Sequence, residues 1–261
     1  MSKPEITYDP SAAAHMALAC LDLTDLNDDS TEEAVLDLCD RAMTAHGPAA
    51  AICIWPRFVA AARKKLGPLS PVRIATVVNF PSGALASDTV VGETVTAIAH
   101  GADEIDVVIP YEALKGGDKG AVRDLLTVVR ASTPPPARLK VILETGELND
   151  TTLIREASDL ALAARADFIK TSTGKVKVNA TLEAAEIMLT AIREAGSSAG
   201  LKPAGGIRTV ADAAAYFALC EKVMGRGWVS PRNFRFGASG LLGDILATLN
   251  GTAPAKSGAD Y

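Results

Sequence analysis

The sequence predicts an α/β fold, a single (β/α)8 (TIM) barrel. Short apolar runs rich in Val, Ile and Leu, without strict alternation, indicate strands buried on both faces of a parallel sheet. Longer amphipathic segments separate these runs, so that eight strand-then-helix units fill most of the 261 residues. That length suits one barrel of this kind. Because alternation alone does not close a sheet, a doubly wound open sheet is the alternative.

The elements follow one another regularly along the chain. The expected strands are Met16–Leu23, Ala50–Ile54, Arg73–Val78, Glu104–Ile109, Leu139–Leu143, Asp167–Lys170, Leu201–Ala204 and Asn233–Phe236. The expected helices lie near residues 31–45, 57–66, 88–100, 120–131, 150–164, 181–195, 209–223 and 239–249. Ser30 (with Glu33 at the capping-box spacing), Asp88 and Asn179 are expected helix caps, and Gly101 is an expected helix end.

The chain is expected to form one catalytic barrel domain over residues 1–250, because no linker or shift of composition divides it. The Pro-rich loop Thr133–Pro136 is too short to separate domains. Within the domain, Met1–Pro10 is expected to be a short extension packed on the barrel. Residues 251–261 are small and polar, and they are predicted to form a flexible C-terminal tail.

The charge balance limits the possible partners. Lys and Arg total 26 against 31 Asp and Glu, so the net charge is -5. Such a chain has no general attraction for nucleic acid or anionic lipid, and neither is an expected partner. Any anionic ligand must therefore be held by a local site.

Several residue types point to a reduced, metal-free protein. No apolar run approaches the roughly 18 residues of a membrane span, and the first ten residues lack a signal-peptide core. The four cysteines form no C-x-x-C pair and are interpreted as reduced thiols, which favours a cytoplasmic location. The three histidines are widely spaced, so neither a metal site nor a cofactor is predicted.

Charged residues inside expected core strands are the main anomaly. Lys170 follows Phe168 and Ile169, Lys202 lies in the next strand, and Asp106 lies two strands earlier. A lysine whose stem packs while its ammonium reaches solvent is the ordinary explanation. The alternative is an amine nucleophile, since burial and a second ammonium nearby both lower the pKa of a lysine. Spacing alone leaves open which lysine that would be.

The size of the required pKa change can be stated. An ordinary lysine, with a pKa of about 10.4, is about one part in 2,500 neutral at pH 7. Lowering that pKa to about 7 disfavours the charged form by roughly 4–5 kcal/mol. Lys202 could supply the second charge near Lys170, and Asp106 could keep Lys202 protonated or carry protons.

Other side chains near the strand ends are weaker candidates. Asp22 ends the first strand and is a possible site residue. Cys53 also ends a strand, where a lone thiol is more simply a small buried hydrophobe. Lys140 stands at the start of its strand, so we expect it toward the opposite rim in a structural role. Lys175 follows Gly174 and either faces the barrel mouth or is a solvated loop charge.

A phosphate site is predicted from the last two loops. In barrels of this architecture, the loops after strands seven and eight commonly grip phosphate. Here they carry Gly205 and Gly206, and then Ser239 within Gly237–Gly240. Glycines let backbone N–H groups approach an anion, and the following helices present positive N-termini. Ordinary tight turns are the alternative.

Together these motifs resemble the deoxyribose-phosphate aldolase family, a family of class I aldolases. The matching segments are LDLTDLN (21–27), AAICIWPRF (50–58), ATVVNFPSG (75–83), GADEIDVVIPY (101–111), LKVILETGEL (139–148), DFIKTSTGK (167–175), LKPAGGIRT (201–209) and FRFGASGLL (234–242). The resemblance implies a (β/α)8 barrel, in agreement with the unit count. It also implies that Lys170 forms a Schiff base while Asp106 and Lys202 relay protons.

The resemblance further implies a phosphate-binding set. Its expected members are Gly205, Gly206 and Ser239, with Thr173 and Lys175 as additional substrate-binding candidates. Members of the family often carry two serines in the last motif, but here Gly240 follows Ser239, which removes one hydroxyl. Long members end in a tyrosine after a flexible tail, and by that resemblance Tyr261 is a possible proton-transfer residue.

The implied reaction is reversible retro-aldol cleavage of 2-deoxy-D-ribose 5-phosphate to D-glyceraldehyde 3-phosphate and acetaldehyde through a lysine Schiff base. No metal is required, because the imine is the electron sink. The expected partners are small phosphosugar and aldehyde substrates and a second copy of the chain in a homodimer. Two alternatives stay open from the sequence: another Schiff-base aldolase or transaldolase with a different donor, and a non-catalytic phosphosugar sensor.

Overall fold

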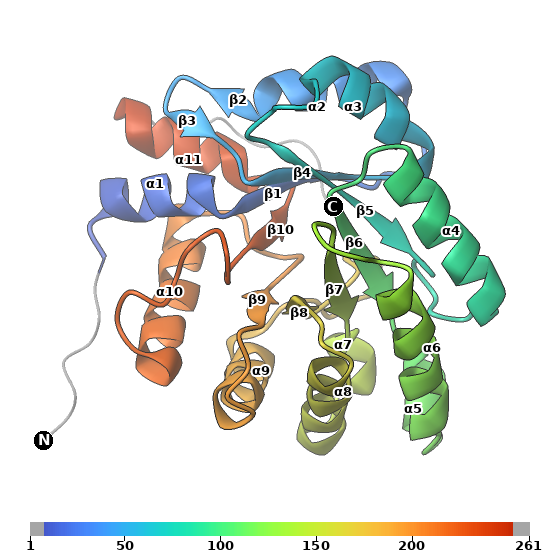
Figure 1. Cartoon of the computed structure of the whole chain (residues 1–261). Coiled ribbons are helices and arrows are strands. Elements are labelled where there is room, and N and C mark those ends of the chain that lie inside the picture. The colour runs from blue at the N-terminus through green and yellow to red at the C-terminus, as the bar shows by residue number, and fades with distance from the viewer. Residues whose placement is uncertain (1–7, 253–261) are drawn as a thin grey trace, which may run out of the picture.

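The computed structural model describes residues 8–252, and its strands form a closed ring (Figure 1). Eight parallel strands run in the order β10-β1-β4-β5-β6-β7-β8-β9. They are β1 (Leu21–Asp25), β4 (Ala51–Ile54), β5 (Arg73–Val78), β6 (Glu104–Val108), β7 (Arg138–Ile142), β8 (Phe168–Lys170), β9 (Gly200–Lys202) and β10 (Phe236–Ala238). Parallel bridges Leu201↔Phe234 and Ala204↔Gly237 join the two ends of this order. The predicted barrel is therefore confirmed, and the open-sheet alternative is wrong.

Helices surround the strand ring on its outside (Figure 1). They are α1 (Pro10–Ala19), α2 (Glu32–Arg41), α3 (Val59–Leu66), α4 (Ser87–Ala99), α5 (Tyr111–Lys115), α6 (Lys119–Ala131), α7 (Thr145–Leu148), α8 (Thr151–Ala163), α9 (Leu182–Glu194), α10 (Val210–Met224) and α11 (Leu241–Asn250). A 3-10 turn, η1 (Pro56–Phe58), leads into α3, and a small hairpin pairs β2 (Met43–Thr44) with β3 (Gly47–Pro48). The eight predicted helices correspond to α2, α3, α4, α6, α8, α9, α10 and α11.

The first predicted strand, Met16–Leu23, is wrong in its first half. Residues up to Ala19 belong to α1, whose first turn begins with Pro10 and is capped by the Asp9 carboxylate accepting from the N–H of Ala12 at 2.9 Å. Alanine-rich sequence favours a helix, whereas its apolar character had suggested a strand. Helix α1 packs against α10 and α11, so it covers the outside of the barrel (Figure 1).

The predicted caps of two helices and the predicted start of the last strand are wrong. Thr31 and Thr181 cap α2 and α9, because their hydroxyls accept the first free helical N–H groups. Ser30 and Asn179 therefore do not cap these helices, and Ser30 instead donates to Asp25. The last strand begins at Phe236 rather than Asn233. Gly101 does end its helix, with a φ of +102° that favours glycine.

The fold has two buried regions, one between the strands and the helices and one inside the ring of strands. Outward-facing strand residues such as Ile105, Ile169 and Leu201 pack against the helices in one apolar core. Inward-facing residues alternate with them and fill the barrel, so that core and barrel interior have separate compositions. Within residues 8–252, no helix is long and apolar enough to cross a membrane. The tail beyond residue 252, with Tyr261, lies outside the described residues, as do the first seven residues.

Candidate active site

Two buried lysines meet at one carboxylate inside the barrel. The Nζ of Lys170 lies 3.0 Å from Oδ2 of Asp106, and the Nζ of Lys202 lies 2.8 Å from the same oxygen. All three residues are at most 2% exposed. The ordinary explanation, an ammonium that reaches solvent at the strand end, therefore does not hold for Lys170. The structure brings together the three residues that the sequence singled out.

Strand alternation explains why these side chains point inward. In β6, Ile105 and Val107 pack outward into the helix-covered core, so Asp106 between them faces the barrel interior. In β8 and β9, Ile169 and Leu201 likewise pack outward, which turns Lys170 and Lys202 inward. Lys170 and Lys202 are register partners, so their side chains leave neighbouring strands at the same level.

Lys140 belongs to the same cluster, and its predicted location at the opposite rim is wrong. Its Nζ lies 2.8 Å from Oδ1 of Asp106 and 2.6 Å from Oε2 of Glu104, with no exposed surface. Lys140 is the third of the five residues of β7, and Asp106 is the third of the five residues of β6, so the two side chains leave neighbouring strands at the same level. Because Lys140 is the register partner of Asp106, its inward direction could have been deduced once the strands were aligned.

Asp22 links the cluster to the first strand. Its Oδ2 lies 2.6 Å from the Nζ of Lys202 and 3.4 Å from that of Lys140. Asp22 thus contacts two cations rather than Lys170, which places this candidate one step from the proposed nucleophile.

The floor of the cluster is Arg235, which the sequence analysis missed. Its guanidinium lies 2.6 Å from Oδ1 of Asp22 and 3.0 Å from Oε1 of Glu104. Arg235 is 1% exposed and stands between Phe234 and Phe236. A charge between two phenylalanines in an expected strand was the signal that could have identified it.

Burial and neighbouring charges divide the lysines into two kinds. Burial is the largest influence on Lys170 and, with the charge of Lys202, outweighs Asp106, so the pKa of Lys170 is lowered. Burial also opposes the charge on Lys202 and Lys140, but the carboxylates around them outweigh it and raise the pKa of both. Likewise, burial acts to raise the pKa of Asp106, but three lysines hold that pKa well below its usual range.

An apolar wall faces this cluster across the barrel interior. It consists of Leu26, Cys53, Ala75 and Val77, with Trp55 and Phe80 packed on it. The rings of Trp55 and Phe80 meet edge to face, with centroids 5.4 Å apart. Burial raises the pKa of the Cys53 thiol, so Cys53 is a neutral group of the wall, in keeping with its interpretation as a buried hydrophobe.

Thr173 and Lys175 lie on the loop that follows β8. The Thr173 hydroxyl donates to Oε2 of Glu144 at 2.5 Å, and its backbone N–H donates to the other oxygen at 3.2 Å. Glu144 is buried at a φ of +56°, and burial raises its pKa. Lys175 forms an ion pair of 3.0 Å with exposed Asp28. Thr173 is thus held by Glu144, and Lys175 is held by Asp28.

The two glycine loops predicted to bind phosphate are neighbours. Gly205 and Gly206 have φ values of +79° and +82°, a conformation that favours glycine. The N–H of Gly205 donates to the carbonyl of Gly237 at 3.2 Å, which joins the loop after β9 to the end of β10. A side chain at Gly205 would also meet Asn179 at 2.7 Å. These glycines therefore bring Ser239 beside the loop of Gly206.

The helices after these loops differ in their N-termini. At α10, Asp212 accepts from the N–H groups of Arg208 and Thr209, and Asp244 accepts from that of Val210. That terminus is already occupied by carboxylates. At α11, by contrast, no side chain of the described residues caps the first turn, which begins after Ser239 and Gly240, and the acidic residue of that turn, Asp244, accepts instead from Val210 of α10. The sequence suggested that the N-termini of both helices favour an anion. These contacts favour an anion at the N-terminus of α11 rather than at both.

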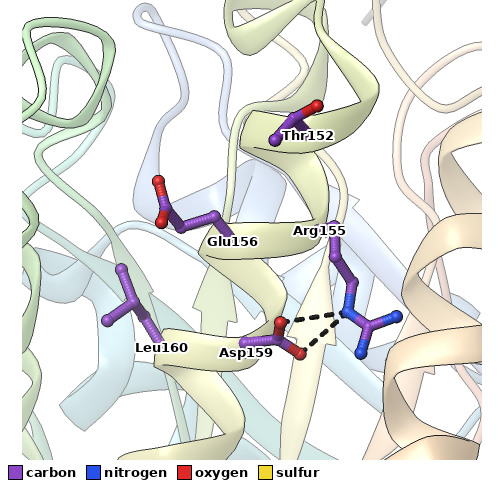
Figure 2. Close-up of a pocket in the computed structure, with 5 residues that line it drawn as sticks. All are labelled: Thr152, Arg155, Glu156, Asp159 and Leu160. Atoms are coloured by element: carbon purple, nitrogen blue, oxygen red, sulfur yellow. Dashed lines mark hydrogen bonds and ion pairs between the residues drawn. The ribbon is translucent and has the colours of Figure 1, made fainter.

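Elsewhere, a shallow pocket lies on the outer face of α8 (Figure 2). Its lining residues are Thr152, Arg155, Glu156, Asp159 and Leu160. Arg155 is already paired with Asp159 at 3.0 Å and with Glu194 at 2.6 Å. Because its charges are compensated and it lies outside the barrel, we do not assign chemistry to this pocket. Among residues 8–252, no three His, Cys, Asp or Glu side chains are grouped to hold a metal ion.

Comparisons with known proteins agree on one family. Residues 16–235 match the family described as DeoC/LacD family aldolase. A deoxyribose-phosphate aldolase from Agrobacterium fabrum is 57% identical over 252 residues, covering 97% of this chain and 97% of that protein. A crystal structure of a putative deoxyribose-phosphate aldolase from Toxoplasma gondii superposes with a TM-score of 0.85 at 25% identity, covering 93% and 96% of the two chains. A deoxyribose phosphate aldolase from Aeropyrum pernix, described as tetrameric, superposes with a TM-score of 0.72 at 25% identity, covering 92% of each chain.

Proposed function

The chain belongs to the DeoC/LacD family of aldolases, and from this premise we propose that Lys170 is the amine that forms a Schiff base with the substrate. The reaction is the reversible cleavage of 2-deoxy-D-ribose 5-phosphate to D-glyceraldehyde 3-phosphate and acetaldehyde. The enzyme is thus a carbon–carbon lyase of the class I aldolase type.

One observation carries the assignment of the nucleophile. Among the three lysines that share Asp106, Lys170 alone has a lowered pKa, and it also has the fewest carboxylate contacts. A lysine needs its neutral form to attack a carbonyl carbon. Lys140 and Lys202 are held charged by two or more carboxylates each, which suits them to donate or hold protons rather than to attack.

The steps follow from this division of roles. The Lys170 amine adds to the aldehyde carbon of the open-chain sugar, and loss of water leaves a cationic imine. A base removes the proton of the 3-hydroxyl, the bond between carbons 2 and 3 breaks, and its electron pair passes into the imine as an enamine. Carbon 3 becomes the aldehyde carbon of D-glyceraldehyde 3-phosphate, which leaves. Protonation of the enamine carbon and addition of water then release acetaldehyde and regenerate Lys170.

Proton movement is assigned to Asp106 and Lys202. Oδ2 of Asp106 lies 3.0 Å from the Nζ of Lys170 and 2.8 Å from the Nζ of Lys202, so one carboxylate oxygen contacts both amines. A carboxylate between two amines can accept a proton from one while the other donates, which is the requirement of the addition and hydrolysis steps. Asp22, 2.6 Å from Lys202, helps keep that lysine charged.

The phosphate is proposed to bind at the start of α11. Ser239 supplies a hydroxyl, Gly206 leaves its backbone accessible, and the uncapped first turn of α11 favours an anion. Gly240 lacks a hydroxyl, so its contribution is restricted to its backbone. Thr173 and Lys175 are proposed to line the mouth between the amine and the phosphate. Tyr261 is a candidate proton-transfer residue, and this assignment comes from the sequence resemblance alone.

Two further parts of the proposal concern the setting of the enzyme. Cys20, Cys39, Cys53 and Cys220 are all unpaired and buried, which supports a reducing, cytoplasmic compartment. We also propose a homodimer, while the Aeropyrum pernix relative is described as tetrameric. Sedimentation equilibrium decides between a dimer, a tetramer and a monomer.

Trapping of the imine tests the nucleophile. Incubation with acetaldehyde and borohydride should leave a reduced two-carbon adduct on the peptide that contains Lys170, detected by mass spectrometry. Lys170→Ala should abolish both the adduct and the cleavage of 2-deoxyribose 5-phosphate. Lys177→Met, at an exposed lysine of the same loop, is the matched control and should retain both. An adduct on a different lysine, or equal turnover by wild type and Lys170→Ala, would contradict the assignment.

A further inference from the structure

The barrel interior holds more positive than negative groups. Its carboxylates are Asp22, Glu104 and Asp106, and its cations are Lys140, Lys170, Lys202 and Arg235. With every group ionised, three negative charges face four positive ones, and all seven residues are at most 2% exposed. A buried excess charge is costly, so the cluster is neutral only when one of its lysines is neutral.

Arg235 is the group that creates this excess. A guanidinium cannot be deprotonated in a protein, whereas each lysine can lose its proton. Arg235 lies 3.0 Å from Glu104 and 2.6 Å from Asp22. It therefore compensates part of the negative charge that would otherwise stabilise the ammonium groups of the lysines. Its Nε is also fixed by the carbonyl of Pro231 at 2.8 Å. The charge of the floor is therefore permanent and held in place.

The contacts determine which lysine gives up its proton. Lys140 lies within 3.4 Å of three carboxylates, and Lys202 within 2.8 Å of two. Lys170 contacts only Asp106 in this cluster, at 3.0 Å, through an oxygen that Lys202 approaches more closely. The excess charge is thus least compensated at Lys170.

Groups on every neighbouring element act on Lys170. Its charged neighbours within the barrel are Asp106 on β6, Lys140 on β7, Lys202 on β9 and, one contact further away, Asp22 on β1, Glu104 on β6 and Arg235 before β10. Arg73 at the start of β5 is partly exposed and approaches Glu104 at 3.8 Å, a longer and more solvated contact than that of Arg235. The Cys53 thiol faces Lys170 from β4, and Glu144 lies after β7 but is bonded to Thr173.

We propose that Arg235 and Glu104 are positioning residues that set the charge of the barrel interior, so that Lys170, rather than Lys140 or Lys202, gives up its proton. Neither residue touches the reacting atoms. They act through the chain of contacts from Arg235 to Glu104, from Glu104 to Lys140 and from Lys140 to Asp106. This inference rests on the proposed role of Lys170 as the nucleophile.

Opposite substitutions test the proposal, because a charge effect must change sign. Arg235→Met leaves three carboxylates against three lysines, so Lys170 should keep its proton to higher pH. Glu104→Gln leaves two carboxylates against four cations, so Lys170 should lose its proton at lower pH. Each change should move the pH midpoint by on the order of one pH unit. The double variant restores the excess of one positive charge and should return the midpoint toward that of the wild type.

The readout is the pH dependence of acetaldehyde trapping on Lys170, since only the neutral amine reacts. The midpoint belongs to the coupled cluster, and differences between variants are compared. A lysine at this position would have Asp22 and Glu104 as partners, and two carboxylates also hold Lys202 charged, so Arg235→Lys should keep the midpoint near that of the wild type. Arg63→Met is the control for loss of an arginine–carboxylate pair elsewhere, because Arg63 pairs with Asp103 at 2.5 Å on the outside of the barrel. It should leave the midpoint unchanged.

The outcomes separate this inference from the proposed function. Shifts of opposite sign, reversed in the double variant, support a charge-setting role. Shifts of the same sign, or unchanged midpoints while Lys170 is still trapped, overturn it and leave the nucleophile in place. Absence of any adduct on Lys170 in the wild type overturns the proposed function itself. If Arg235→Met does not fold, Glu104→Gln and the double variant still give the sign of the effect and its reversal.

Discussion

The two sides of the barrel interior have opposite compositions. On the side of β4 and β5, inward positions are Cys53, Ala75 and Val77, which are apolar and carry no charge at neutral pH. On the side of β6 to β9, inward positions include Asp106 and Lys170, which are charged or titratable. Both sides are equally buried. The same strand geometry thus presents an apolar wall to an ionic cluster.

This contrast explains how an amine can become a nucleophile inside a protein. An apolar wall alone would disfavour the charge on any buried lysine, and the lysine would simply be neutral and inert toward proton transfer. A cluster of carboxylates alone would hold every lysine charged. Lys170 is between the two, because burial lowers its pKa while Asp106 keeps a proton acceptor in contact. Substitutions in the ionic cluster and in the apolar wall should therefore have different effects on Lys170.

Removal of Lys170 should give the largest loss of activity and, unusually, a gain of stability. Lys170→Met should reduce kcat/KM by about 10⁴-fold or more, because the covalent step is lost. The same change removes the uncompensated amine and should raise the free energy of unfolding by about 1–2 kcal/mol in urea titrations. Lys140→Met is the matched control. It removes the cation that lies 2.6 Å from Glu104 and 2.8 Å from Asp106, so these buried carboxylates lose a direct partner and that free energy should fall by about 3 kcal/mol. Equal destabilisation by both would contradict the division of the lysines.

Neutralising the shared carboxylate should have the next largest effect. Asp106→Asn leaves Lys140, Lys170 and Lys202 without their common partner, so kcat/KM should fall by about 10²–10⁴-fold. The free energy of unfolding should fall by about 3–5 kcal/mol. Asp103→Asn is the control, since Asp103 pairs with Arg63 outside the barrel and accepts from Ile74. Activity near that of the wild type in Asp106→Asn would remove Asp106 from proton transfer.

The sequence predicted the part of this comparison that depends on single strands. Lys170, Lys202 and Asp106 each stood out as a charge in an apolar run, and their strands were close to the observed bounds. The sequence did not predict the floor of the cluster. Lys140 was placed at the wrong rim, because the length of its side chain and its register with Asp106 are tertiary facts. Element boundaries failed for the same reason at α1, whose helical state depends on packing against α10 and α11.

The phosphate loops show a second limit of sequence reasoning. Glycine placement in the last two loops indicated an anion site, and the two loops are indeed adjacent. Local spacing does not distinguish the two helices that follow these loops. Only the contacts of Asp212 and Asp244 show that the terminus of α10 is occupied by carboxylates. Long-range partners of this kind cannot be deduced from local spacing.

A variant at the proposed phosphate site should leave both the apolar wall and the ionic cluster of the barrel interior unchanged. Ser239→Ala removes one donor to a charged group, which is worth about 1.5–3 kcal/mol, so KM for 2-deoxyribose 5-phosphate should rise by about 10- to 100-fold. The pH midpoint of Lys170 trapping with acetaldehyde, which has no phosphate, should be unchanged. Gly240→Ser is the complementary variant and should lower KM if the missing hydroxyl matters. An altered pH midpoint in Ser239→Ala would show that the phosphate end and the amine are coupled.

The smallest expected effect comes from making the apolar wall slightly polar. Val77→Thr keeps the shape of the side chain but places a hydroxyl among Cys53, Ala75 and the register partner Asp106. The active form of Lys170 is the neutral amine, which predominates above its pKa. A hydroxyl that helps solvate the ammonium raises this pKa toward the ordinary lysine value, so the acid limb of kcat/KM moves to higher pH and the rate near pH 7 falls by about two- to fivefold. Val107→Thr is the matched control, because Val107 is equally buried but faces the helices. It should destabilise the fold similarly and leave the acid limb in place. A shift of equal size in both variants would mean that general loss of packing, rather than the polarity of the wall, controls Lys170.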